Sequence, residues 1–126
     1  MGSLKELKII IADDSKLIRD VVSRTLSRIE GFNVIGVAAN GVEALELVRE
    51  REPQLLVLDI TMPLKDGITV LDELRAEGSD LVIAMFTADQ SPFARKACLD
   101  LGANYYVDKS ELGELIEICS LHLLAL

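Results

Sequence analysis

The chain has 126 residues, enough for one domain with a single core, and half of them are hydrophobic. Its formal net charge of −8 argues against direct binding of nucleic acid or of an anionic membrane surface by this domain. No hydrophobic run is long enough to cross a membrane and no signal peptide is visible, so we expect a cytoplasmic protein. Cys98 and Cys119 lack the spacing of a zinc or disulfide motif, which favours two buried free thiols.

Five hydrophobic runs have the length and composition of buried strands, and a helical pattern follows each of them. The predicted strands cover residues 7–12, 32–38, 55–58, 81–86 and 104–107. The helices are expected to begin at Asp14 or Ser15, at Asn40, near Ile68, at Ser91-Pro92 and near Glu111. Because strands and helices alternate at this spacing, we predict a doubly wound α/β domain with parallel strands joined by right-handed crossovers.

The most informative stretch is residues 55–67, LLVLDITMPLKDG. A buried strand ends at Asp59, Met62-Pro63 interrupts regular structure, and Asp66-Gly67 turns the chain into the next helix. The strand therefore delivers one carboxylate to the edge of the sheet where α/β proteins bind ligands. An aspartate at this place is equally typical of a simple loop cap, so this stretch alone does not distinguish a functional aspartate from a capping one.

Polar side chains follow the other strands as well. The carboxyl ends of parallel strands share one edge, where we expect Asp13, Asp14, Asp59, Thr87 and Lys109 to meet. Clustered carboxylates repel one another unless a cation relieves the repulsion, and Mg²⁺ prefers oxygen ligands of this kind. A central carboxylate can attack phosphorus to form an acyl phosphate, whose oxygens an ammonium and a hydroxyl would stabilise. The set predicts a Mg²⁺-dependent, phosphoryl-accepting aspartate.

Over nearly its whole length the chain resembles the receiver domain of two-component response regulators. The resemblance rests on Asp13-Asp14, on the run from Asp59 to Gly67, on Thr87-Ala88, and on the run from Tyr106 to Lys109 (YVDK). It implies a flavodoxin-like (βα)5 fold with a five-stranded sheet in the order 2-1-3-4-5. It also implies that residues 6–126 form the receiver domain, with residues 1–5 a disordered N-terminus or a cloning remnant.

The resemblance implies roles for individual residues. Asp59 would be the phospho-acceptor for a partner sensor histidine kinase or phosphotransfer protein, and Lys109 would pair with the phosphoryl group. Asp14, Asp59 and the backbone carbonyl of Thr61 would ligate Mg²⁺ or Mn²⁺, and Asp13 would act mainly through a bound water. Such a module is not a conventional enzyme, although it would catalyse its own phosphorylation and dephosphorylation.

The resemblance further implies a switch made of Thr87 and Tyr106. Thr87 would move towards the phosphoryl group and Tyr106 would swing inward with it. The surface of the fourth helix, fifth strand and fifth helix would change, controlling homodimerisation, an output domain or a partner. An aromatic residue in a short strand is as often part of the core as part of a switch, so both readings of Tyr106 stay open.

Two features depart from the common receiver pattern. Many receivers have a cis proline after the lysine, whereas Ser110 follows Lys109 here, which leaves the isomer of that peptide bond open. Asp89 lies two residues beyond Thr87, and we hypothesise that its carboxylate changes the rate at which water attacks the acyl phosphate.

Two other classes of protein fit the sequence less well than the phosphorylated module. A dehalogenase-type phosphatase would need a second aspartate two residues after the nucleophile, where this chain has Thr61. A receiver-like binding module that no longer accepts phosphate is disfavoured because every chemical position is filled.

Overall fold

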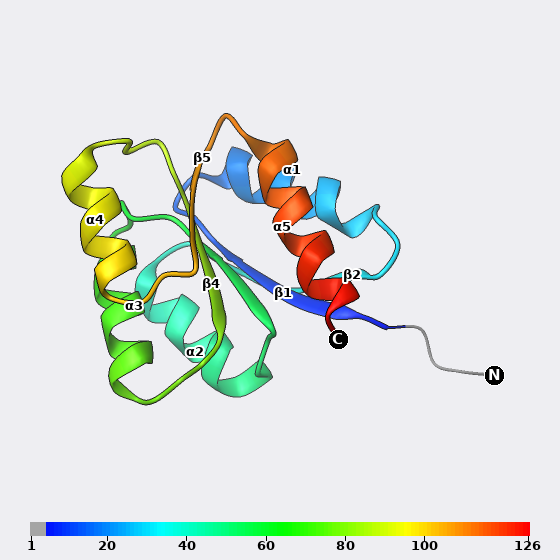
Figure 1. The fold of residues 1–126 in the computed structure, drawn as a ribbon, viewed down its shortest axis with the longest axis horizontal. Helices are drawn as coiled ribbons and strands as arrows, with labels where there is room; N and C mark the ends of the chain where they lie inside the picture. The colour runs from blue at the N-terminus through cyan, green and yellow to red at the C-terminus, as the bar shows by residue number, and fades with distance from the viewer. Residues whose placement is uncertain (1–4) are drawn as a thin grey trace.

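The structure, a computed structural model, describes residues 5–126 (Figure 1). The strands are β1 Leu7–Ala12, β2 Phe32–Ala38, β3 Leu55–Leu58, β4 Val82–Thr87 and β5 Tyr105–Asp108. The helices are α1 Lys16–Ser27, α2 Gly41–Arg51, α3 Gly67–Ala76, α4 Pro92–Asp100 and α5 Leu112–Leu124. Apart from Lys5, the segment 1–5 that was expected to be disordered lies outside the described residues.

All strand pairs are parallel and follow the order β2-β1-β3-β4-β5, which confirms the predicted fold class and strand order. Helices α1 and α5 cover one face of the sheet, and α2, α3 and α4 cover the other (Figure 1). Within residues 5–126, no helix combines the length and hydrophobicity that crossing a membrane requires.

Two hydrophobic clusters, one on each face of the sheet, form the core. Side chains alternate between them along a strand, so that Ile9 packs towards α1 and α5 whereas Ile10 packs towards α2 and α3. The same alternation sends Tyr105 and Tyr106 to opposite faces. Strand β3 is buried along its whole length, which explains its uninterrupted hydrophobic sequence.

Side-chain caps fix the helix starts around the carboxyl edge of the sheet. Ser15, Asn40 and Ser91 each accept a hydrogen bond from the backbone amide three residues later, at 3.3, 2.9 and 3.2 Å. Ser15, and not Asp14, is therefore the cap of α1. This leaves the carboxylate of Asp14 available for other contacts.

Strands β4 and β5 are displaced by one residue from their predicted ranges, 81–86 and 104–107. Thr87 and Asp108 pair with each other in the last rung of the ladder between the two strands. Thr87 is thus held by the sheet itself, and Lys109 follows directly after the end of β5.

Strand β2, at one edge of the sheet, contains an irregularity. Its pairing with β1 runs from Ile9 opposite Val34 to Ile10 opposite Gly36, which leaves Ile35 as an extra residue. The guanidinium of Arg51 donates a hydrogen bond to the carbonyl oxygen of Ile35.

Candidate functional site

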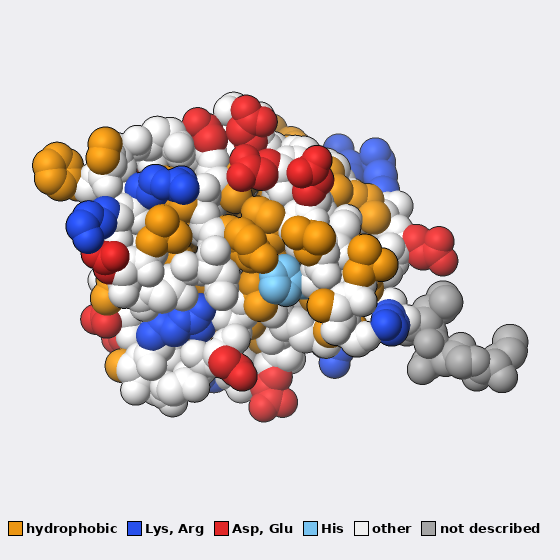
Figure 2. All heavy atoms as spheres, in the orientation of Figure 1, with side chains coloured by type: hydrophobic (Ala, Val, Ile, Leu, Met, Phe, Trp, Pro, Cys, Tyr) orange, Lys and Arg blue, Asp and Glu red, His pale blue; other side chains and the backbone are white. Residues whose placement is uncertain are grey.

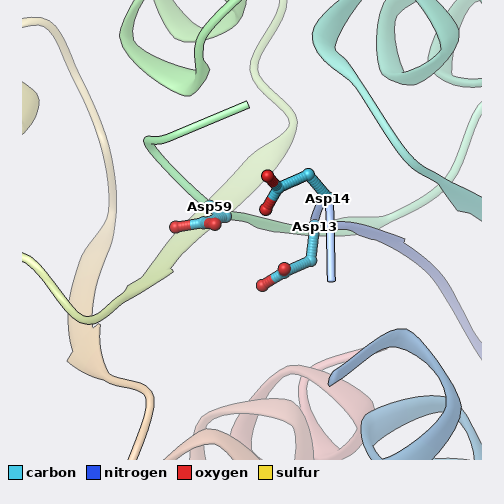
Figure 3. A group of neighbouring side chains, drawn as sticks. All are labelled: Asp13, Asp14 and Asp59. Atoms are coloured by element: carbon cyan, nitrogen blue, oxygen red, sulfur yellow. The ribbon is translucent and has the colours of Figure 1, made fainter. Parts of the chain in front are cut away.

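Three carboxylates meet at the carboxyl edge of the sheet. Asp13 and Asp14 follow β1, Asp59 follows β3, and one oxygen from each lies within 4.8 Å of the others (Figure 3). Asp13 and Asp59 are buried, with 2% and 3% of their surface exposed, whereas Asp14 is exposed. The structure thus brings together the three acidic residues that the sequence placed at the strand ends.

Asp59 stands at the centre of the site, with both carboxylate oxygens engaged. Oδ1 accepts a hydrogen bond from the amide of Ile60 (2.8 Å), and Oδ2 accepts one from Nζ of Lys109 (2.9 Å). Burial raises the pKa of the Asp59 carboxyl, and this effect outweighs the opposing hydrogen bond from Lys109. The negative charge of Asp13 raises that pKa further. A cation in this site would therefore favour the ionised, nucleophilic form of Asp59.

Lys109 bridges the two buried carboxylates. Its Nζ lies 2.8 Å from Oδ2 of Asp13 and 2.9 Å from Oδ2 of Asp59. Burial lowers the pKa of Lys109, but its contacts with Asp13 and Asp59 prevail and the net shift is upward. The backbone amide of Lys109 donates to the carbonyl of Thr87 (3.1 Å). The peptide bond between Lys109 and Ser110 is trans, as are all the described peptide bonds.

The donor set fits a divalent cation. The cluster holds three carboxylates and the Lys109 ammonium contacts two of them, so these four side chains carry an excess of two negative charges when all are ionised. Oδ2 of Asp13 is buried and lies 2.8 Å from Nζ of Lys109. The carbonyl of Thr61, two residues after Asp59, accepts no hydrogen bond in this part of the chain. Carboxylate and carbonyl oxygens of this kind suit a hard cation such as Mg²⁺.

The loop between β3 and α3 returns closely to Asp59. The amide of Gly67 donates to the carbonyl of Ile60 (2.7 Å), and a Cβ at position 67 would lie 2.0 Å from the carbonyl oxygen of Asp59. Only glycine fits at this approach. Leu64, at the exposed tip of the loop, has a φ of 68°, a backbone conformation that residues other than glycine rarely adopt.

Thr87 and Tyr106 lie beside the acidic cluster. Oγ1 of Thr87 accepts a hydrogen bond from the amide of Asp89 (3.2 Å), so its own proton remains available to another acceptor. The hydroxyl of Tyr106 donates to the carbonyl of Asp89, and the guanidinium carbon of Arg95 lies 5.7 Å from the centre of its ring. Tyr106 is buried, and its burial raises the pKa of its hydroxyl to about 12. In this structure the side chain of Tyr106 therefore already occupies the inward, buried position.

The carboxylate of Asp89, for which a role in hydrolysis was hypothesised, makes a local contact. Its Oδ1 accepts a hydrogen bond from the amide of Ser91 (2.9 Å), which lowers the pKa of this carboxyl. The residue itself is exposed. The structure gives it a turn contact in the loop before α4, and its effect on hydrolysis stays a prediction.

Sequence reasoning missed Arg19, whose guanidinium reaches the site from α1. Its Nη1 donates to the carbonyl oxygen of Asp13 (2.9 Å). The signal that could have revealed it is its spacing, one helical turn after the Ser15 cap, which returns the side chain to the end of β1.

Comparison with known proteins bears on the identity of the chain. Residues 9–120 match the family profile of the response regulator receiver domain. Response regulator MprA of Mycobacterium leprae is 43% identical over 103 residues, which cover 82% of this chain and 44% of the relative. MprA of Mycobacterium ulcerans is 42% identical over the same shares. The chain thus spans less than half the length of these curated relatives.

Solved structures agree with this match. A LuxR-family two-component response regulator from Aurantimonas has a TM-score of 0.88 and 30% identity, covering 96% of this chain and 87% of that one. The CheX-CheY-BeF3-Mg²⁺ complex from Borrelia burgdorferi contains a chain with a TM-score of 0.86 and 28% identity, covering 94% and 90%. The sequence match over most of its length, together with this fold and strand-end site, shows that the chain belongs to the response regulator receiver domain family of two-component systems.

Proposed function

We propose that this receiver domain accepts a phosphoryl group on Asp59 from a partner sensor histidine kinase or phosphotransfer protein. The observation that carries the proposal is the position of Asp59, buried between the Lys109 ammonium and two further carboxylates. The domain is in this view a signalling module and not a conventional enzyme, because the acceptor is its own side chain.

The transfer would be a displacement at phosphorus. A carboxylate oxygen of Asp59 attacks the phosphorus of a phosphohistidine, and the bond from phosphorus to the histidine nitrogen breaks. The electron pair of that bond stays on the imidazole, and the new O–P bond makes Asp59 an acyl phosphate. Lys109, released from the ionised carboxylate, pairs with a phosphoryl oxygen, and the hydroxyl of Thr87 donates to another.

Asp13, Asp14, Asp59 and the carbonyl of Thr61 would hold Mg²⁺ or Mn²⁺, with Asp13 acting mainly through a bound water. Bound there, the cation would supply positive charge that balances the carboxylates and the oxygens of the incoming phosphoryl group. The excess of negative charge supports this assignment, as does the carbonyl of Thr61, which accepts no hydrogen bond in the described residues. A similar chain from Borrelia burgdorferi was solved as a complex with BeF3 and Mg²⁺.

The first experiment is the intact mass of the protein after incubation with acetyl phosphate or phosphoramidate, with and without Mg²⁺. We expect a Mg²⁺-dependent gain of one phosphoryl group that hydroxylamine removes. Asp59→Asn should show no gain, whereas Asp72→Asn, a matched change at an exposed position of α3, should behave like the parent. Absence of any gain in the parent would favour a receiver-like module that works without phosphate.

The output surface of the proposed switch is formed by α4, β5 and α5. Movement of Thr87 and Tyr106 would change this surface. Figure 2 shows hydrophobic side chains grouped over β5 and α5 around a histidine, with basic side chains over α4 and acidic ones over the start of α5. The exposed charges include Arg95 and Lys96 on α4 and Glu114 on α5. Opposite charges on one surface suit a two-fold contact between two copies.

Sedimentation of the protein with and without beryllofluoride and Mg²⁺ tests this surface. We expect the treated parent to form a dimer, and Leu121→Glu, on an exposed position of α5, to remain a monomer. Val21→Glu introduces the same charge on an exposed position of α1 and should leave the dimer intact. A treated parent that stays monomeric would contradict homodimerisation and direct the search to a heterologous partner.

A further inference from the structure

Hydrogen bonds orient the two buried carboxylates of the site but leave the exposed one without support. Oδ1 of Asp13 accepts from the amide of Ser15 (2.9 Å), and Oδ1 of Asp59 accepts from the amide of Ile60 (2.8 Å). Within residues 5–126, no donor or cation contacts the carboxylate of Asp14, although it faces the other two (Figure 3). The position of Asp14 in the cluster therefore depends on its backbone.

Arg19 holds that backbone. Its Nη1 donates to the carbonyl oxygen of Asp13 at 2.9 Å, and this carbonyl belongs to the peptide group that joins Asp13 to Asp14. Among the described residues, no other donor reaches this oxygen. The amide of Arg19 donates to the carbonyl of Ser15 (3.0 Å), so the first turn of α1 fixes the base of the arginine side chain. Arg19 is half-buried there, which limits its freedom to move away.

We infer that Arg19 is a positioning residue for the metal site: it orients the Asp13–Asp14 peptide so that the carboxylate of Asp14 faces Asp13 and Asp59. As the metal site belongs to the function proposed above, this role rests on that proposal. Outer-shell partners of metal ligands typically change metal affinity by about 10- to 100-fold. A single hydrogen bond to a backbone carbonyl belongs at the lower end, so we expect an effect of about tenfold.

The test compares the Mg²⁺ affinity of the parent with that of Arg19→Met and Arg24→Met, followed by shifts of backbone amide resonances during a Mg²⁺ titration. Arg24 is an exposed arginine of the same helix, and no hydrogen bond from its side chain is found in the described residues. Both variants lose one positive charge, so a general electrostatic effect on the cation is matched. We expect the Kd for Mg²⁺ to rise about tenfold in Arg19→Met and to stay unchanged in Arg24→Met. Arg19→Lys, which keeps a donor, should recover much of the affinity.

Equal Mg²⁺ affinity in Arg19→Met and Arg24→Met would overturn the inference. The same holds if Arg19→Met lowers the melting temperature of the metal-free protein but binds Mg²⁺ like the parent, because Arg19 would then be structural only. If Arg19→Met does not fold, Arg19→Gln, whose shorter side chain cannot span the same distance, takes its place in the comparison.

A parent protein that binds no Mg²⁺ would instead refute the metal site of the proposed function. The amide resonance of Asp14 in the metal-free protein then decides the role of Arg19 by itself. It should shift in Arg19→Met and not in Arg24→Met if Arg19 orients the peptide. An unchanged resonance in both variants would overturn the inference.

Discussion

Replacing Gly67 by alanine tests how tightly the β3–α3 loop is closed on the acceptor. The added Cβ would lie 2.0 Å from the carbonyl oxygen of Asp59, 2.8 Å from its carbonyl carbon and 3.0 Å from Cα of Ile60. All three are backbone atoms, so no side-chain rotation can relieve the overlap. Overpacking of this kind costs about 1–3 kcal/mol, and the better helix propensity of alanine returns at most about 1 kcal/mol. We expect the variant to lose about 2 kcal/mol of unfolding free energy.

Urea unfolding followed by circular dichroism measures this loss, and the melting temperature should fall by roughly 8 °C for a domain of this size. Gly113→Ala is the matched control, since a Cβ at position 113 in α5 meets no atom within 4 Å. That variant should gain up to about 1 kcal/mol from helix propensity. If Gly67→Ala were as stable as the parent, the inferred closeness of the loop to Asp59 would be wrong.

Three further outcomes are expected. Burial raises the pKa of the Asp59 carboxyl, so the stability that this carboxyl contributes is complete below the ordinary carboxyl pKa and is lost as pH rises through the raised value. Asp59→Asn should therefore stabilise the metal-free protein at neutral pH. Urea unfolding in EDTA should show that this gain in unfolding free energy shrinks towards about pH 4. A gain independent of pH would contradict this account. Arg75 donates two hydrogen bonds to the carbonyl of Gly102 (3.0 and 2.9 Å). Arg75→Lys loses this fork and should lower the free energy of unfolding by about 1 kcal/mol, measured as a lower urea midpoint. An unchanged midpoint would count against a stabilising role of the fork. Tyr106→Phe removes the hydrogen bond to the carbonyl of Asp89 and should cost about 1 kcal/mol while phosphoryl uptake by mass stays normal; loss of uptake would show that the hydroxyl serves the acceptor site directly.

The sequence was sufficient to predict the architecture because its strands are short, hydrophobic and separated by clear caps. Ser91-Pro92 and Asn40 begin helices where predicted, and the carboxylates of three aspartates meet as expected. The strand order came only from the family resemblance, since alternation of strands and helices is compatible with several orders. The ends of β4 and β5 were wrong by one residue because hydrophobicity ends at Phe86 while pairing continues to Thr87.

Details set by tertiary contacts were not predictable from local patterns. The pairing of Lys109 with both Asp13 and Asp59 depends on the distance between three strand ends. The carboxylate of Glu43 accepts a hydrogen bond from the amide of Ala39 (3.0 Å), one residue before the Asn40 cap. The Arg19 contact was missed for a related reason, because it links a helix side chain to a backbone carbonyl and leaves no compositional signal.

The irregular edge strand β2 has a consequence for aggregation. An exposed strand edge can pair with the edge of another chain, and proteins protect themselves by interrupting it. Here the extra residue Ile35 interrupts the regular edge, and its carbonyl oxygen already accepts a hydrogen bond from the guanidinium of Arg51. At the opposite edge, β5 has only four residues. Both borders of the sheet thus resist templated growth, which should keep the folded domain from adding strands of other chains to its sheet.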